Sequence, residues 1–246
     1  MYFSLSKYIL MTAKKSLSIF LSACFSFFFA TLFAQINPGV YVSDFENETH
    51  ELKIDDTFFI HSVYQKSPAK FIKTAGGYYT TANDTLKITL EFHSNYRLDS
   101  ITNLNFPYKI EGDNLIIKGN SEGLFNKQPN VNQDLDGAWL FATRGPDEGQ
   151  KRRGEANTRK TLKFLKDGRF QWIAYDTEGM QFKGTGGGSY TSKDGVYTEH
   201  IEYFSRDNDR VGASLEFNYE TKGDDWHHTG KNSKGEPMYE IWARRK

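Results

Sequence analysis

Apolar and polar residues alternate with a period of two in several short stretches of this chain. Two such stretches carry the apolar sets Leu86, Ile88, Leu90, Phe92 and Leu104, Phe106, Tyr108, Ile110. Successive side chains of a β-strand point to opposite faces, so this period predicts half-buried strands. We find no amphipathic stretch that predicts a helix long enough to cover a sheet. We therefore expect antiparallel strands that close as a barrel or stack as a sandwich.

The pattern occurs twice, because the chain matches itself without a gap when it is shifted by 111 residues. The matched positions are glycines, aromatic residues and turn acids, which a β fold restricts most. They include Gly76/Gly187, Gly77/Gly188, Tyr79/Tyr190, Glu91/Glu202, Phe106/Phe217 and Gly112/Gly223. Each copy opens with Gly-x-aromatic, at Gly39 and Gly137, which are 98 residues apart. The second copy thus carries 13 additional residues, which we place between Arg144 and Arg159.

The repeat and the N-terminal sequence divide the chain into four segments. We expect a signal peptide over 1–34, a first β unit over 37–124, a linker over 125–133 and a second β unit over 134–246. The linker is polar and rich in asparagine, which is typical of a connection between domains. Within the second unit, Lys166-Asp167-Gly168-Arg169 and Ser192-Lys193-Asp194-Gly195 predict tight hairpins, because aspartate and glycine suit their turns.

Three motifs of the second unit carry a resemblance to a known family. They are Leu135-Asp136-Gly137-Ala138-Trp139, the central Gly-Gly-x-Tyr-Thr and Tyr239-Glu240-Ile241-Trp242. The unit resembles a lipocalin-like domain of unknown function found in secreted proteins of the Bacteroidota, and the first unit resembles it more weakly. The resemblance implies an all-β protein with two tandem antiparallel lipocalin-like barrels, and it supplies no catalytic residues. In the first unit Tyr41 replaces the tryptophan and no counterpart of the strand around Ile241 is visible. We therefore expect this barrel to be incomplete or to be closed by the second unit.

Residues 1–34 are typical of a cleaved signal peptide. Two lysines at 14–15 precede a mainly apolar run over 17–33, and Ala34 stands where cleavage would occur. Cleavage would leave a secreted or periplasmic chain without a transmembrane span. Two alternatives stay open: a membrane anchor, since the run is barely long enough for a tilted span, and lipidation at Cys24 within a lipobox-like motif.

Composition excludes several kinds of chemistry. Cys24 is the only cysteine, so a chain cleaved after Ala34 would hold no disulfide and no cysteine nucleophile. The same cleavage lowers the formal charge from 0 to −3, and we expect no nucleic-acid partner for such a near-neutral protein. Adjacent His227 and His228 point to opposite faces of a strand and cannot share one ion. We expect neither a metal nor another cofactor.

The inward positions of the two copies differ in chemistry. Ile88 becomes Glu199, Ile117 becomes His228, and Leu115 becomes Trp226. A buried carboxylate is costly unless it is paired or lines a wet cavity, so these changes predict a polar pocket in the second barrel. The alternative is that Glu199 and His228 face solvent at a barrel mouth. Together they could act as base and acid, or form a structural ion pair.

Three further residues are candidates for the same pocket. Arg144 begins a basic loop and would hold an anionic group of a ligand, unless that loop is simply solvated. Tyr219 is the candidate catalytic acid, and Tyr175 would join Trp226 in contacting a sugar or small molecule. Both tyrosines have tyrosine counterparts in the first copy, so core packing is their alternative role.

These observations favour a ligand-binding protein whose second barrel holds a small molecule or an oligosaccharide, including an anionic one. The first unit would be a structural or docking partner. The alternative is an enzyme, a lyase or dehydratase that moves a proton on a uronate-containing oligosaccharide. A purely structural envelope protein that docks on other proteins is the third hypothesis.

Overall fold

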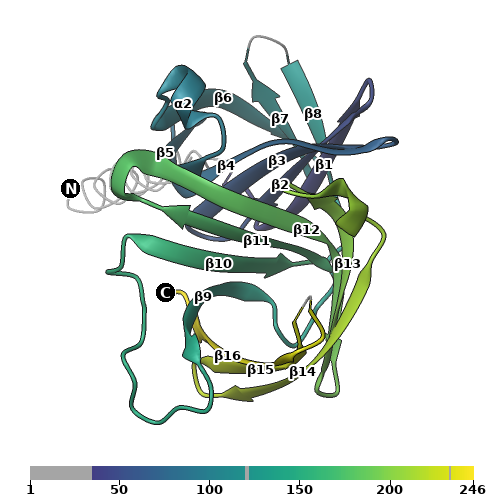
Figure 1. Cartoon of the computed structure of the whole chain (residues 1–246). Coiled ribbons are helices and arrows are strands. Elements are labelled where there is room, and N and C mark those ends of the chain that lie inside the picture. Colours follow the sequence, from purple (N-terminus) through teal and green to yellow (C-terminus); the bar gives the residue numbers. More distant parts are fainter. Residues whose placement is uncertain (1–34, 120–121, 233) are drawn as a thin grey trace, which may run out of the picture. The chain divides into compact units, whose positions relative to one another are not determined.

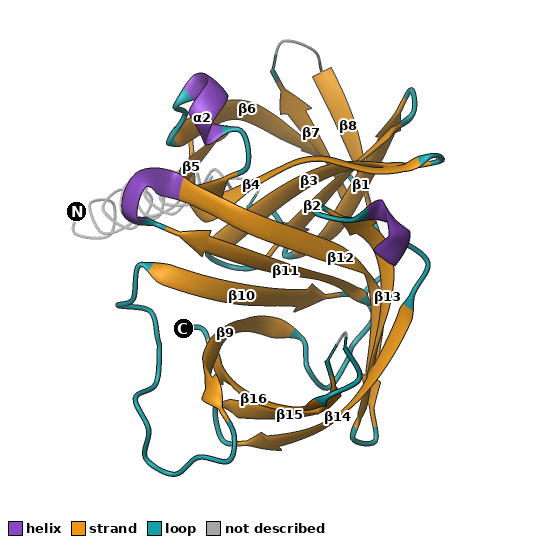
Figure 2. Cartoon of the chain, viewed as in Figure 1, coloured by secondary structure: helices purple, strands orange, loops and turns teal. Residues whose placement is uncertain are grey.

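The computed structural model describes residues 35–119, 122–232 and 234–246. Most of these residues lie in sixteen antiparallel strands that form two closed eight-stranded barrels (Figures 1 and 2). The all-β fold expected from the alternation is thereby confirmed. The segment expected to be a signal peptide, including Cys24, lies outside the described residues.

The first barrel is an up-and-down meander, and consecutive strands are neighbours throughout. A single helical turn, α2 (Tyr96–Asp99), connects its fifth and sixth strands. Its strands are β1 (Gly39–Phe45), β2 (Glu48–Ile54), β3 (Phe58–Lys66), β4 (Ala69–Ala82), β5 (Thr85–His93), β6 (Asn103–Glu111), β7 (Asn114–Lys118) and β8 (Glu122–Lys127).

The second barrel repeats this topology. Its extra residues form the long connection between the first two strands, as the two repeat spacings predict. Two short 3-10 turns occur here: η2 (Asn208–Arg210) stands at the position of α2, and η1 (Glu178–Met180) has no counterpart in the first barrel. The strands are β9 (Gly137–Arg144), β10 (Arg159–Lys166), β11 (Arg169–Asp176), β12 (Gln181–Lys193), β13 (Val196–Phe204), β14 (Ser214–Lys222), β15 (Asp225–Lys231) and β16 (Pro237–Arg244).

Both hairpins predicted in the second unit are present. Asp167 and Gly168 join β10 to β11 with φ angles of 48° and 72°, and Asp194 and Gly195 join β12 to β13 with 52° and 82°. Positive φ at both central residues matches the right-handed twist of the flanking strands, which explains the Asp-Gly pairs.

The first barrel differs from the expectation at its closure. β8 pairs with β1 through Tyr41↔Lys127 and Val42↔Asn126, so the barrel closes on itself without a strand from the second unit. This strand runs across the boundary expected between 124 and 125. It escaped notice because its sequence, Glu-Gly-Leu-Phe-Asn-Lys, is short and merges into the polar linker.

A β-bulge interrupts the alternation in both barrels at the same place. Gly77 pairs with Leu90 and Gly76 with Phe92, which leaves Glu91 as the extra residue. The bulge turns Phe92 outward, so the expectation that Phe92 continues the inward set was wrong, and the equivalent bulge in β13 turns Tyr203 outward. A Cβ atom on Gly77 would lie 1.9 Å from the carbonyl oxygen of Thr89, which explains the glycine.

The barrels pack against each other through the same outer surface of each copy. Phe71 stacks on its own equivalent Phe182, with ring centroids 6.2 Å apart. Two other ring pairs are equivalent to each other. The ring centroids of Tyr175 and Phe92 are 5.2 Å apart, and those of Tyr64 and Tyr203 are 4.6 Å apart. Reciprocal contacts of this kind characterise an isologous dimer interface, here formed within one chain.

One half of this interface is apolar and the other is polar. The apolar half contains Phe58, Ile60, Phe92, Ala138, Leu140, Leu162, Phe164, Ile173 and Tyr175. In the polar half, Arg169 donates to Glu51 at 2.7 Å and also forms a bidentate ion pair with Glu202. Lys53 pairs with Glu51, and its ammonium nitrogen lies 3.4 Å from the amide oxygen of Gln171.

Candidate functional site

The interior of the second barrel is filled with aromatic rings. Trp139 contacts Trp226, and Trp226 also contacts Trp242 and Tyr197, with centroid separations between 5.0 and 6.0 Å. Trp139, Trp226 and Tyr197 are fully buried. The predicted ligand contact Trp226 is therefore a central member of this core.

Glu199 points inward, as the comparison of the copies predicted, and is only 4 % exposed. Its carboxylate accepts hydrogen bonds of 2.8 Å from both Lys163 and the hydroxyl of Tyr197. The ammonium group of Lys163 lies 4.9 Å from the ring centroids of Tyr197 and Trp226 and 5.2 Å from that of Trp242. A buried carboxylate is tolerated here because a cation and a hydroxyl neutralise it.

His228 also points inward and is 2 % exposed. Its ring contacts Phe217 at 4.4 Å and Trp226 at 5.1 Å, and its Nδ1 lies 3.7 Å from a carboxylate oxygen of Glu240. Burial, reinforced by the charge of Lys163, lowers the pKa of His228 to about 4. The imidazole is thus neutral at pH 7.

The other predicted site residues lie elsewhere. Arg144 is exposed at the end of β9. Tyr175 is buried between the barrels, where its hydroxyl donates to Glu91 at 2.7 Å. Tyr219 is paired with His228 across β14 and β15, but its hydroxyl donates to Asp134, and burial together with this bond raises its pKa to about 12. The structure thus brings Glu199, His228 and Trp226 together and leaves Arg144 and Tyr175 apart from them.

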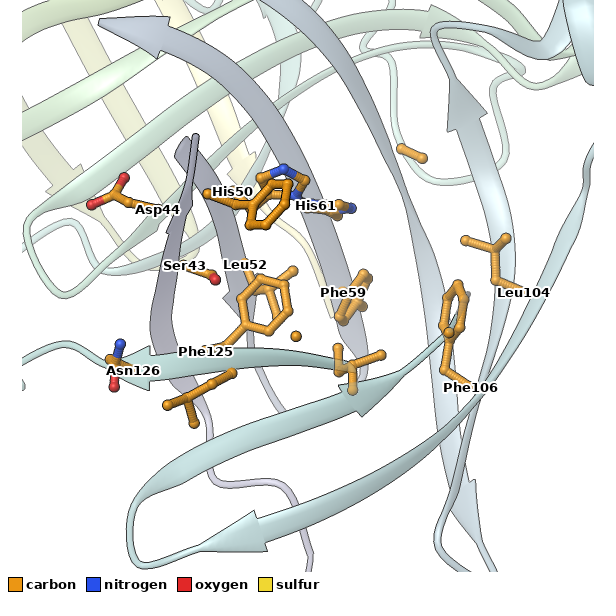
Figure 3. A pocket seen from close by; sticks show the side chains of 16 residues that line it. Ser43, Asp44, His50, Leu52, Phe59, His61, Leu104, Phe106, Phe125 and Asn126 are labelled. Carbon is orange, nitrogen blue, oxygen red and sulfur yellow. Dashed lines mark hydrogen bonds between the residues drawn. The ribbon is translucent and has the colours of Figure 1, made fainter. Parts of the chain in front are cut away.

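A cavity of about 550 Å³ lies inside the first barrel (Figure 3). Most of its wall is apolar and comes from Leu52, Phe59, Ala75, Leu104, Phe106, Ile117, Leu124 and Phe125. The opposite end of this barrel is filled by residues that include Ile36, Tyr41, Ile54 and Tyr108. The cavity therefore belongs to the copy that the sequence comparison had interpreted as the scaffold.

Side-chain size explains which barrel is hollow. Leu52 and Leu115 of the first copy are replaced by Lys163 and Trp226 in the second, where both fill the interior. His61 is replaced by the larger Trp172, which packs against the aromatic core. The first copy thus has room for a molecule at the place where the larger Lys163 and Trp226 pack in the second copy.

Two histidines give the cavity a polar wall. Nδ1 of His50 lies 3.2 Å from Nε2 of His61, and Nε2 of His50 lies 3.6 Å from a carboxylate oxygen of Glu48. Burial, with the nearby charges of His50 and Lys73, lowers the pKa of His61 to about 3. Burial also lowers the pKa of His50, so both rings are neutral at pH 7.

The cavity reaches the surface between β1 and β8. These strands pair only at Tyr41 and Val42 within the described chain, whereas the equivalent β9 and β16 pair from Trp139 to Arg144. Beyond Val42, both strands line the cavity with residues 43–45 and 123–126. Phe45 and Leu124 flank this opening and are 67 % and 47 % exposed. Two exposed apolar side chains at the entrance of an apolar cavity are suited to guiding an apolar molecule inward.

The sequence contained signals for Lys163 and for the histidine pair. Leu52 becomes Lys163 in the same copy in which Ile88 becomes Glu199, so opposite charges appear together at inward positions. In the reverse direction, Thr161 and Trp172 of the second copy are His50 and His61 in the first. The comparison of the copies considered only apolar residues of the first copy that become polar in the second, so this histidine pair was not predicted.

Fold and cavity together define a tandem β-barrel protein whose first barrel holds a cavity and whose second barrel has an aromatic core. Residues 134–246, the second barrel, match a protein family described as "Domain of unknown function (DUF4488)". No curated protein matches the chain.

Two further findings concern the described residues. Among residues 35–119, 122–232 and 234–246, no three His, Cys, Asp or Glu side chains come together in a way that could hold a metal ion. In the same part of the chain, no helix has the length and apolar character needed to cross a bilayer.

Proposed function

We propose that this protein binds a small, largely apolar molecule in the lumen of the first barrel, in the manner of a lipocalin-like carrier. The cavity of about 550 Å³ carries this proposal. Its volume falls within the roughly 300–1,000 Å³ typical of small-molecule sites, and its apolar wall with a few polar groups is typical of them as well.

The lining distinguishes between the ligand classes considered for this chain. An oligosaccharide needs many hydrogen-bond partners, whereas most of this wall consists of leucine, isoleucine and phenylalanine side chains. The lyase hypothesis has less support, because Glu199 is held by Lys163 and Tyr197 in a filled core. A buried, fully paired carboxylate is not free to take a proton from a substrate.

We also propose that the protein works outside the cytoplasm, as a secreted or periplasmic carrier. The support is the signal-peptide character of residues 1–34.

Binding of the neutral fluorophore N-phenyl-1-naphthylamine tests the cavity. Its fluorescence rises in an apolar environment, so titration of the purified protein should give saturable enhancement. Ile117→Trp should reduce the affinity at least tenfold, because the larger ring occupies the space that the probe needs. Leu104→Trp fills the same cavity from β6 and provides a second variant in case the first folds poorly.

Val196→Trp is the matched control, since Val196 is exposed on the second barrel and an added ring there leaves the cavity unchanged. Circular dichroism verifies that all variants are folded. Undiminished probe binding by both folded filling variants would show that the site is not in the first barrel.

A further inference from the structure

The polar groups of the cavity gather near its opening. β2 runs from the hairpin beside the opening towards the filled end, so His50 is closer to the entrance than Leu52, and Leu52 is closer than Ile54. On β3, His61 pairs with Leu52 and Phe59 pairs with Ile54, which places His61 nearer the entrance than Phe59. A molecule in this cavity therefore meets an apolar interior and a polar wall close to the exit (Figure 3).

We infer that the ligand is a single-chain amphiphile with an uncharged, hydroxyl-bearing head, an inference that rests on the proposed function. The apolar chain lies among Phe59, Phe106 and Ile117, and the head lies against His50 and His61 beside the β1–β8 opening. Such a molecule matches the order in which apolar and polar groups follow each other along the cavity wall.

The hydrogen bonds of the histidine pair favour a donor on the ligand. The carboxylate of Glu48 faces Nε2 of His50 and favours a proton on that nitrogen. Nδ1 of His50 is then an acceptor, so the 3.2 Å contact has to be donated by Nε2 of His61. This leaves Nδ1 of neutral His61 with a lone pair, on a side chain that lines the cavity. A hydroxyl group satisfies it, whereas a carboxylate would place lone pairs against a lone pair.

The charges around the opening favour neither an anionic nor a cationic head group on the ligand. Asp44 lies at the rim and pairs with Lys66 at 3.7 Å, and Glu48 stands beside the histidines. Lys73 is exposed and close enough to affect both histidines electrostatically. Among these four described residues, the two carboxylates and the two ammonium groups balance. An ionic head would lose hydration there without gaining a counter-ion of its own.

Competition between three amphiphiles of equal chain length tests this inference. 1-Decanol, decanoate and decyltrimethylammonium carry the same apolar chain with a neutral, an anionic and a cationic head. Each is titrated against the complex of the purified protein with N-phenyl-1-naphthylamine. We expect 1-decanol to displace the probe about tenfold more tightly than either ion, a difference that corresponds to about 1.4 kcal/mol.

His61→Phe keeps an aromatic ring at this position and removes the acceptor nitrogen Nδ1. It should lower the affinity for 1-decanol by roughly three- to tenfold, the range of one hydrogen bond, and leave the affinity for the neutral probe unchanged. His200→Phe is the matched control, because His200 is exposed on β13 of the second barrel and bonds to Ser214.

The outcomes separate this inference from the proposed function. Preferred binding of decanoate, equal binding of the three heads, or an unchanged preference in His61→Phe would each overturn the uncharged head while probe binding stands. Absence of probe binding in the parent protein would overturn the proposed function, and the amphiphile with it.

Discussion

His228 shows what a single ionisable residue costs inside an aromatic core. Aromatic rings enclose the imidazole, and neither ring nitrogen has a hydrogen-bond partner among the described residues. The neutral ring is tolerated, but the charged one has to form in a medium that solvates it poorly. The position is isoleucine in the first copy, so the fold itself does not require a histidine.

This residue should make the protein sensitive to acid. Its pKa is about 4 in the folded state, below the usual 6.5, so the unfolded chain binds more protons between these values. The free energy of unfolding therefore falls as the pH drops from about 6.5 to about 4. His228→Ile should remove up to about 3 kcal/mol of this loss, measured by urea denaturation at pH 7 and pH 4.

The exposed His200→Ile variant is the control and should keep the acid-side loss of the parent. His61, whose pKa is about 3, accounts for a further part of the sensitivity in all these proteins. An acid-side loss of the same size in His228→Ile and the parent would show that this imidazole does not titrate on unfolding.

At the scale of elements, inward residues on two strands differ together between the two copies. Lys163 on β10 and Glu199 on β13 occupy the positions of Leu52 and Ile88 on β2 and β5. Either change alone would leave an uncompensated buried charge. The joint change keeps the core neutral, and the Tyr197 hydroxyl completes the bonds of the carboxylate.

Replacing Lys163 and Glu199 by the residues of the first copy, with the Tyr197 hydroxyl removed as well, tests this coupling. Lys163→Leu alone should lower the free energy of unfolding by about 3–5 kcal/mol, because Glu199 stays buried without its cation. The triple variant Lys163→Leu, Glu199→Ile, Tyr197→Phe should come within about 2 kcal/mol of the parent, since all three polar partners are gone. Chemical denaturation measures both, and equal losses in the single and triple variants would contradict the coupling.

The elements themselves were largely predictable from the sequence. Alternation, Asp-Gly turns and the 111-residue repeat are local signals, and they led to the antiparallel strands and the hairpins at Asp167 and Asp194. Two features, β8 and the bulge at Glu91, were not predicted because their causes are not local. β8 is too short to show a period, and the bulge at Glu91 becomes visible only when its partner strand is paired with it.

The candidate site was less predictable, for a reason of the same kind. The inward direction of Glu199 and His228 follows from strand period, and the structure shows it. Whether a barrel is hollow depends on the summed volume of side chains from all its strands, which no single motif reveals. Polar substitutions in the second copy predicted a pocket there, whereas the described residues place Lys163 and three tryptophans in that interior and a cavity in the first barrel.

At the scale of the whole molecule, the polar half of the interface links the two barrels through buried charges. Arg169 of the second barrel bonds to Glu51 of the first, and Glu51 is only 1 % exposed. The charges of Arg169 and Lys53 hold the pKa of Glu51 below its usual value despite the burial that opposes this. The carboxylate is therefore ionised and depends on these partners.

Arg169→Ala should destabilise the protein strongly, because it leaves Glu51 and Glu202 without a shared cation. We expect a loss of about 3–5 kcal/mol in the free energy of unfolding, measured by chemical denaturation. Arg206→Ala is the matched control and should cost well under half as much, since Arg206 binds the carbonyl oxygen of Lys183 in an exposed loop. Similar losses in the two variants would show that the buried network does not hold the barrels together.

The unequal halves of the interface also set a limit on how this chain can change. Two second barrels brought together through this surface would place Leu162 and Phe164 against Arg169 and Gln171, and two first barrels would oppose Glu51 and Lys53 to Phe58 and Ile60. Neither barrel can therefore form this interface with a second copy of itself. Each barrel therefore depends on the other. Deleting either unit would expose charged or apolar groups of the remaining barrel that only the deleted unit covers.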